Sequence, residues 1–281
     1  MGTVETRRMC PHCRAFITTK DRVCPYCDTT VGQRAIERRS PADIAGGLIP
    51  AARFITSMIL LINFGLYIAT VLYSVTAGNP NGWMDPDGRT LLFFGAKRGP
   101  EIILGGQYWR LITAGFLHGG AMHILMNSWV LFDLGAQVEE FFGASRMMVI
   151  YFVSTITGFM ASLFWAPMSL SIGASAGIFG LIGAMIAFGV REKTHMASAM
   201  RGVYIRWALF GLVLGLLPLP IDNAAHVGGL AGGFVTAYVT GTPKLRGGFA
   251  EQFWKIAAAM SVVLTALSFL LAFYSAGLFG S

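Results

Sequence analysis

Four polar side chains with catalytic chemistry lie inside long apolar stretches of this sequence. They are His123 and Asn127 in one stretch, Ser175 at the start of another and His226 at the start of a third. Strongly polar residues inside an apolar span are costly and usually mark function. A serine hydroxyl becomes a nucleophile when a base such as an imidazole takes its proton. The residue types therefore make Ser175 and His226 candidates for a nucleophile and its base.

The elements that must position these residues are membrane spans. Of the 281 residues, 54% are hydrophobic and 12% are charged, against roughly 25% charged residues in soluble domains. A bilayer span needs about 20 residues, and the sequence predicts seven spans, at 55–77, 121–141, 147–165, 175–190, 203–217, 224–240 and 253–274. We therefore expect an all-α polytopic membrane protein. No secretory signal peptide is visible before the first span.

The positions of lysine and arginine predict the orientation of these spans. With the N-terminus in the cytoplasm, most of the 21 Lys and Arg residues fall in inside segments, as the positive-inside rule requires. The exceptions lie in one long loop, 78–120, and are Arg89, Lys97, Arg98 and Arg110. The predicted topology is N-terminus inside and C-terminus outside, in a bacterial inner membrane. The net charge of +7 is then explained by topology, and we expect no nucleic-acid partner.

The alternating direction of the spans brings the polar residues to one depth in the bilayer. The second, fourth and sixth spans all run from outside to inside, and each carries its polar residue within about two turns of its outer end. His123 and Asn127 are four apart and share one helix face. Small residues around Ser175 and His226 let helix backbones approach closely. Helix-to-helix hydrogen bonding would explain any one of these residues alone, but four at one depth indicate a site.

Three segments of the chain resemble a known family. GASAGIFG at 173–180, LHGGAMHILMN at 117–127 and AHVGGLAGG at 225–233 are similar to the signature segments of the rhomboid intramembrane serine proteases. The Tyr-Trp-Arg stretch at 108–110 and the pattern Gly135, Glu139, Gly143 resemble further motifs of that family. The resemblance covers about 55–241, and it implies a rhomboid-like six-helix bundle to which a C-terminal seventh helix is added.

The resemblance also implies an activity and a role for each residue. The activity is hydrolysis of peptide bonds in or near transmembrane segments of membrane proteins by a Ser175–His226 dyad, which needs no cofactor. His123 and Asn127 would donate hydrogen bonds to the oxyanion. The implied supporting residues are His118 at a water-retaining cavity, Phe179 under the His226 ring, Trp109 and Arg110 anchoring the first loop in the interface, and Glu139 bonding within the structure. The segment 218–222 would cap the site and, with the fifth span, gate substrate entry.

The sequence does not fix the roles of three residues. The family usually has glycine directly after the nucleophile, whereas this chain has Ala176. Its methyl either tilts the dyad or is accommodated by the surrounding packing. Asp222, one turn before His226, either orients that ring or caps the helix, and we favour the cap. Asp133 lies in mid-span without an assigned partner.

Other classes of protein share some of these sequence features. A non-catalytic rhomboid-like chaperone or adaptor that binds transmembrane helices would share the fold, since fold does not fix function. The sequence GASAG also satisfies the GxSxG motif of soluble α/β-hydrolases, but that motif needs a preceding buried strand, and here it opens a predicted membrane helix. A transporter would need polar residues strung across the bilayer, whereas these are confined to one side.

The four cysteines form a separate motif near the N-terminus. Cys10, Cys13, Cys24 and Cys27 make two CxxC pairs, a spacing typical of one tetrahedral metal ion. Four thiolates would close the coordination sphere, so we predict a structural zinc ribbon; two disulfides are the alternative. The expected organisation is a cytosolic ribbon at 1–30, a linker at 31–54, the core at 55–241 and the seventh helix with the C-terminus at 242–281. The expected partners are transmembrane substrates, the lipid bilayer and a cytosolic protein docked at the ribbon.

Overall fold

A computed structural model of the protein describes residues 7–10, 12–18, 21–31, 53–243 and 248–279. The chain divides into two compact units, Met1–Ala51 and Ala52–Ser281. The predicted linker at 31–54 lies almost entirely outside the described residues.

The first unit is a small hairpin with two tight turns. Strand β1 (Arg7–Met9) pairs antiparallel with β2 (Phe16–Thr18). Among the described residues of this unit, the buried cluster consists of Cys10, Ile17, Cys24 and Val31. A cluster of this size supplies little stabilisation by burial, and a metal bound by its cysteines would add to it.

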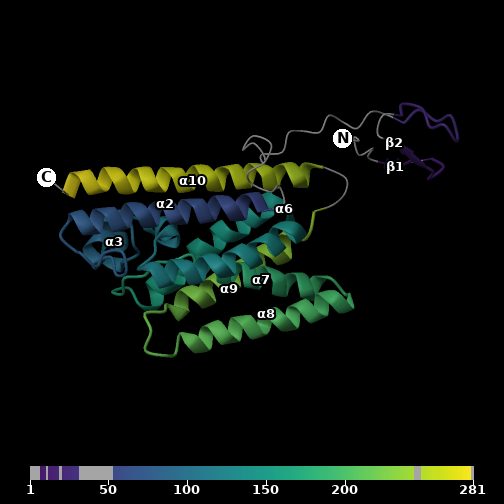
Figure 1. The fold of residues 1–281 in the computed structure, drawn as a ribbon. Helices are drawn as coiled ribbons and strands as arrows, with labels where there is room; N and C mark the ends of the chain where they lie inside the picture. The colour runs from purple at the N-terminus through teal and green to yellow at the C-terminus, as the bar shows by residue number, and fades with distance from the viewer. Residues whose placement is uncertain (1–6, 11, 19–20, 32–52, 244–247, 280–281) are drawn as a thin grey trace. The chain divides into compact units, whose positions relative to one another are not determined.

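The second unit is helical (Figure 1). The long helices are α2 (Phe54–Thr76), α6 (Ala121–Trp165), α7 (Ser175–Arg191), α8 (His195–Leu214), α9 (Asn223–Thr240) and α10 (Phe249–Phe279). Short helices fill the loop between α2 and α6, namely α3 (Gly88–Phe94), α4 (Gly99–Ile103), α5 (Arg110–Thr113) and a 3-10 turn at Ala114–Phe116.

Four of the described helices, α2, α6, α8 and α10, are long and apolar enough to cross a membrane, and α7 is a shorter apolar helix. Helix α6 has 45 residues, far more than the roughly 20 that span a bilayer. Its helical dihedrals are interrupted at Gly143, whose φ of 75° lies in a region that glycine adopts readily. This break falls between the second and third predicted spans. The all-α polytopic membrane fold is therefore as predicted.

The fifth predicted span was misplaced. It was expected at 203–217, but α8 begins at His195 and ends at Leu214. Its first turns carry polar residues that an apolar stretch does not include, and the start is set by the Thr194 hydroxyl, which accepts a hydrogen bond from the Ala197 N–H (3.1 Å). This is an N-cap, a stronger local signal for a helix start than hydropathy.

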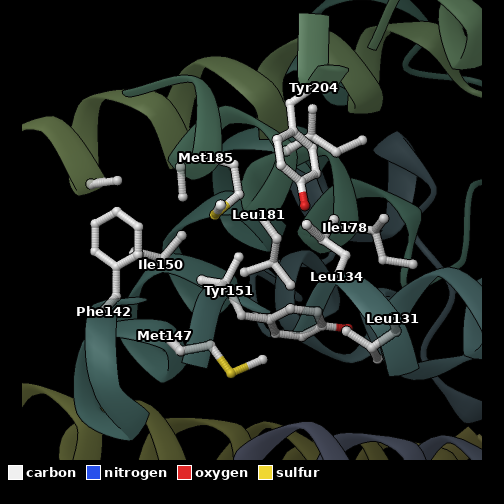
Figure 2. Packing of buried hydrophobic residues seen from close by; sticks show 14 of the residues in the cluster. Leu131, Leu134, Phe142, Met147, Ile150, Tyr151, Ile178, Leu181, Met185 and Tyr204 are labelled. Atoms are coloured by element: carbon white, nitrogen blue, oxygen red, sulfur yellow. The ribbon is translucent and has the colours of Figure 1, made fainter. Parts of the chain in front are cut away.

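Helix α7 lies at the centre of the bundle and packs against α6, α8 and α9. Figure 2 shows large buried side chains of α6, α7 and α8, among them Tyr151, Leu181 and Tyr204, filling the space between these helices. Glycines bring α7 and α9 into backbone contact, because a Cβ at Gly233 would collide with the Gly180 carbonyl. The predicted close approach of these two helices is what positions the site.

Helix α10 is tied to α6 by a bidentate ion pair. Both Arg146 guanidinium Nη atoms lie 2.7 Å from a Glu251 carboxylate oxygen, and Arg146 is buried. Along the same helix, Phe269 packs edge-on against Phe116 at a centroid distance of 5.8 Å. The last helix is thus a docked part of the bundle.

Candidate active site

Ser175 is the first residue of α7, and the chain reaches it through a turn that only glycine fits. Gly173 has a φ of +126°, and its N–H donates to the Ala114 carbonyl (2.9 Å). The N-cap residue Ala174 offers no side-chain acceptor to the first turn of α7. The first N–H groups of that helix are therefore left for other acceptors, and the helix dipole favours negative charge beside them.

His123 and Asn127 face this turn from α6. A Cβ at Gly173 would lie 2.8 Å from His123 Nε2 and 3.6 Å from Asn127 Nδ2. The Gly119 N–H donates to His123 Nδ1 (3.3 Å), which assigns the neutral ring a proton on Nε2. Asn127 Nδ2 is buried without a hydrogen-bond partner among the described residues. Buried donors are normally paired. The N–H groups of His123 Nε2 and Asn127 Nδ2 are therefore available to a ligand beside Gly173, two residues before Ser175.

His226 lies in the first turn of α9 and is only 6% exposed. Its ring stacks on Phe179, with centroids 4.0 Å apart and planes 10° apart. Phe179 is four residues after Ser175 and so shares its helix face. The neighbours Ala176 and Ala225 pack in one buried cluster. The fold therefore brings the two candidate dyad residues to facing positions on α7 and α9.

No hydrogen bond joins Ser175 to His226 in the described part of the chain, and His226 Nδ1 has no partner there. Catalytic hydrogen bonds are often long before substrate binds and tighten in the complex. The helix start that carries His226 is fixed by Asp222, whose Oδ1 accepts from the Ala225 N–H (3.0 Å). Asp222 is thus the N-cap of α9, and its carboxylate lies one turn before the imidazole.

The methyl of Ala176 is accommodated by a glycine on α6. Ala176 is fully buried, and a Cβ added at Gly158 would lie only 2.7 Å from the Cβ of Ala176. The space for the methyl exists because residue 158 has no side chain. The methyl of Ala176 therefore fits between α7 and α6 in this bundle.

His118 is buried beside the site. Its ring meets that of His123 edge-on at a centroid distance of 5.1 Å, and neither of its nitrogens has a partner among the described residues. Two free nitrogens of one ring next to the candidate oxyanion donors are compatible with bound water.

Arg110 holds the first loop together from inside. Its Nη1 donates to the carbonyls of Leu92 and Ala96 (both 2.8 Å), and its Nε to Gln107 Oε1 (2.6 Å). The guanidinium also lies over the half-buried Trp109 ring, 4.6 Å from its centroid. Arg110 is itself buried, so it anchors the loop to its own carbonyls, whereas Trp109 remains partly exposed.

Glu139 caps helix α2. Its carboxylate accepts from the N–H groups of Ile55 (3.0 Å) and Thr56 (3.1 Å), and from the Thr56 hydroxyl (3.0 Å). An acidic group at a helix N-terminus is favourable because it meets the positive end of the helix dipole. Glu139 therefore joins the first and second predicted spans.

Asp133 belongs to a polar chain that links α6 to α8. The Tyr204 hydroxyl donates to Gln137 Oε1 (2.8 Å), and Gln137 Nε2 donates to Asp133 Oδ2 (3.1 Å). The spacing of four residues between Asp133 and Gln137 was a sequence signal for this pair. The partner on α8 could not be read from the sequence.

The four cysteines of the first unit form a candidate metal centre. Their sulfurs lie within 4.8 Å of one another, with 3.7 Å between Cys10 and Cys27 and 3.6 Å between Cys13 and Cys24. Tetrahedral thiolates at the zinc–sulfur bond length are about 3.8 Å apart, whereas a disulfide needs roughly 2.05 Å. The thiols are all free. The group can therefore hold one metal ion.

The backbone builds this centre from two equivalent turns. Cys10 N–H donates to the Ala15 carbonyl (2.9 Å), and Cys24 N–H donates to the Thr29 carbonyl (3.0 Å). Each turn ends in a residue with positive φ, which is 60° at Arg14 and 52° at Asp28. Repetition of the turn aims both cysteine pairs at one point.

A helical polytopic membrane protein with a serine and a histidine on facing helices is the class that this fold and site define. Residues 105–243 match the model of the Rhomboid domain, and the chain belongs to the rhomboid family.

The relatives differ in what their names say of activity. Rhomboid protease GluP of Bacillus subtilis (strain 168) is 35% identical over 181 residues, which are 64% of this chain and 34% of the relative. Rhomboid-like protease 2 of Toxoplasma gondii is 34% identical over 186 residues, 63% of each chain. Inactive RHOMBOID-like protein 8 of Arabidopsis thaliana is 31% identical over 159 residues, 56% of this chain and 45% of the relative. The matched regions thus span less than two thirds of each of these relatives.

Proposed function

We propose that this protein is an intramembrane serine endopeptidase that hydrolyses peptide bonds in or near transmembrane segments of other proteins. The observation that carries this proposal is the stacking of His226 on Phe179, one helical turn from Ser175. The arrangement supports a dyad because it fixes an imidazole over the helix face that presents the hydroxyl. The name of the Bacillus subtilis relative, a rhomboid protease, points to the same activity.

The proposed reaction has two steps on the same residues. The Ser175 hydroxyl attacks the peptide carbonyl carbon while His226 takes its proton, and His226 then returns that proton to the departing amine. Water, reaching the site from the outer face, loses a proton to His226 and attacks the acyl-enzyme ester. This releases the new carboxylate and restores the Ser175 hydroxyl. The Ser175 N–H, His123 Nε2 and Asn127 Nδ2 would stabilise the oxyanion in both steps.

We also propose the organisation that surrounds this chemistry. The ribbon, linker, core and terminal segment keep the expected bounds, 1–30, 31–54, 55–241 and 242–281. The thiolate set fits zinc, which would supply structural stability and no catalytic step. The N-terminus is proposed to lie in the cytoplasm of a bacterial cell and the C-terminus outside, so the ribbon is available to a cytosolic protein.

The second candidate function is a non-catalytic adaptor that binds transmembrane helices. The observation that favours it is the match to a relative named inactive. Against it, this chain retains Ser175, His226, His123 and Asn127, the full set that the proposed reaction uses.

The deciding experiment is cleavage of a single-span model substrate by the purified chain in detergent and in liposomes. Cleavage by the wild type and none by Ser175→Ala would support the protease. If neither protein cleaves several substrates that both bind, the adaptor takes its place, and Ala176→Gly becomes the next variant to assay.

Removal of an oxyanion donor is expected to slow cleavage without weakening substrate binding. Asn127→Ala should lower kcat by about 10²-fold, since its Nδ2 would bond only the charge that develops in the transition state. Steady-state kinetics should show KM little changed. Asn81→Ala, on an exposed turn of the first loop, is the matched control. An increase in KM at unchanged kcat would instead place Asn127 in substrate binding.

A further inference from the structure

Lys97 is a buried cation that the proposed reaction does not use. It lies between α3 and α4, and its side chain is 0% exposed. Its Nζ donates to the carbonyls of Ser162 (3.1 Å), Ala166 (2.7 Å) and Ser169 (3.4 Å). Lysine is almost never fully buried unless it is paired. Here the ammonium sits at the C-terminal end of α6, where the helix carbonyls carry partial negative charge.

Asp222 is the carboxylate that balances this cation. Its Oδ2 accepts from the hydroxyl of Ser162, the same residue whose carbonyl accepts from Lys97 Nζ. Burial lowers the pKa of Lys97, and the charge of Asp222 counters that shift. Burial raises the pKa of Asp222, but hydrogen bonds from Ser162 and Ser171 reverse this and hold its pKa below the ordinary value. Both observations are consistent with a pair of opposite charges, a buried ammonium and a half-buried carboxylate, connected through Ser162.

The pair holds the two chain segments that lead to the dyad. Lys97 and Ser171 exchange backbone hydrogen bonds, each 3.0 Å long, and Ser171 precedes Ser175 by four residues. Asp222 precedes His226 by four residues, and its carbonyl accepts from the His226 N–H (3.1 Å). One end of the network therefore fixes the approach to the nucleophile, and the other fixes the first turn under the base.

We propose that Lys97 and Asp222 are positioning residues that set the alignment of Ser175 with His226 by locking the first loop and the end of α6 onto the start of α9. This inference rests on the proposed function. Neither residue touches the reacting atoms in it. Misplacement of a catalytic group by about 1 Å can cost roughly 10²-fold in rate. A network this close to Ser175 and His226 is therefore expected to affect kcat strongly.

The test is a double-mutant cycle with Lys97→Met, Asp222→Asn and the double variant, each as the full chain in detergent. Labelling of Ser175 by a fluorophosphonate probe measures dyad alignment, and cleavage kinetics separate kcat from KM. Each single variant is expected to lose about 10²-fold in labelling rate and kcat at unchanged KM. The double variant should lose less than the two single losses combined, because no buried charge is left unpaired. Lys193→Met, at an exposed loop lysine, is the control.

Two results would overturn the inference, namely single variants that label at the wild-type rate, or losses that combine without interaction in the double variant. Asp222→Asn retains an acceptor for the Ala225 N–H, so it carries the test should Lys97→Met not fold. If the wild type itself is not labelled, the proposed function fails. The pair is then judged by melting temperature, where non-additive shifts in the same cycle support its coupling and additive shifts overturn it.

Discussion

Replacing His226 with alanine is expected to lower kcat by about 10⁴-fold, as much as replacing Ser175 does. The hydroxyl cannot lose its proton without the imidazole, and no other described aromatic ring stacks on Phe179, one turn from Ser175. Because the two residues act as one unit, the variant lacking both should be no slower than either single variant. Cleavage of a single-span substrate in detergent, followed to low turnover, measures all three.

The matched control for this series is His195→Ala, which removes an exposed imidazole at the start of α8. It should cleave at the wild-type rate. The dyad would be refuted by a His226→Ala variant that keeps substantial activity, or by a double variant that is far slower than both singles. Either result would mean that Ser175 is activated by another base.

The helix bounds were predictable where an apolar run begins beside a local start signal. The bounds predicted at 175–190 and 224–240 match the helices Ser175–Arg191 and Asn223–Thr240, because Gly173 and Asp222 mark where those helices begin. Neither helix is among the described ones that are long and apolar enough to cross a membrane. Helix α8 was misplaced although Thr194 caps its start, because the prediction followed hydropathy alone. Its first two turns are polar on one face, so they contribute to the helix but not to an apolar stretch.

The candidate site was predictable because its residues are costly in their surroundings. His123, Asn127 and His226 are polar groups in apolar spans, and such groups can be recognised without coordinates. Lys97 gave no comparable signal. In the sequence it is one more charged residue of the first loop, and its Nζ bonds carbonyls that lie 65 to 72 positions away in the chain. Arg110 shows the same limit, since the bonds that bury it come from within the folded loop.

The cysteine centre was predictable from sequence spacing, and the structure adds the distances between its sulfurs. The CxxC spacing predicted a metal site from the sequence alone, and the sulfur separations near 3.7 Å fit tetrahedral thiolates better than disulfides. The spacing could not predict the size of the buried cluster around the cysteines in the described part of this unit. Its buried cluster contains two cysteines and only two aliphatic residues, Ile17 and Val31.

Replacing Cys10 with serine is therefore expected to release the metal and unfold the ribbon. Structural zinc contributes roughly 10–16 kcal/mol of apparent binding free energy in small ribbons and fingers, which exceeds what this cluster can supply by burial. Metal analysis of the purified full chain should fall from one zinc per chain to none, and proteases should cut within 7–31. The control is His12→Ala, at an exposed residue of the same turn, which should keep its metal.

The same variant tests whether the two units work separately. Substrate cleavage by Cys10→Ser in detergent should equal that of the wild type, because no residue proposed for the reaction lies in the first unit. Complete loss of cleavage would contradict this separation and give the ribbon a part in catalysis. Retention of one zinc per chain by Cys10→Ser would contradict the four-thiolate centre itself. Unchanged cleavage together with lost metal would show that the four-cysteine unit takes no part in cleavage in detergent.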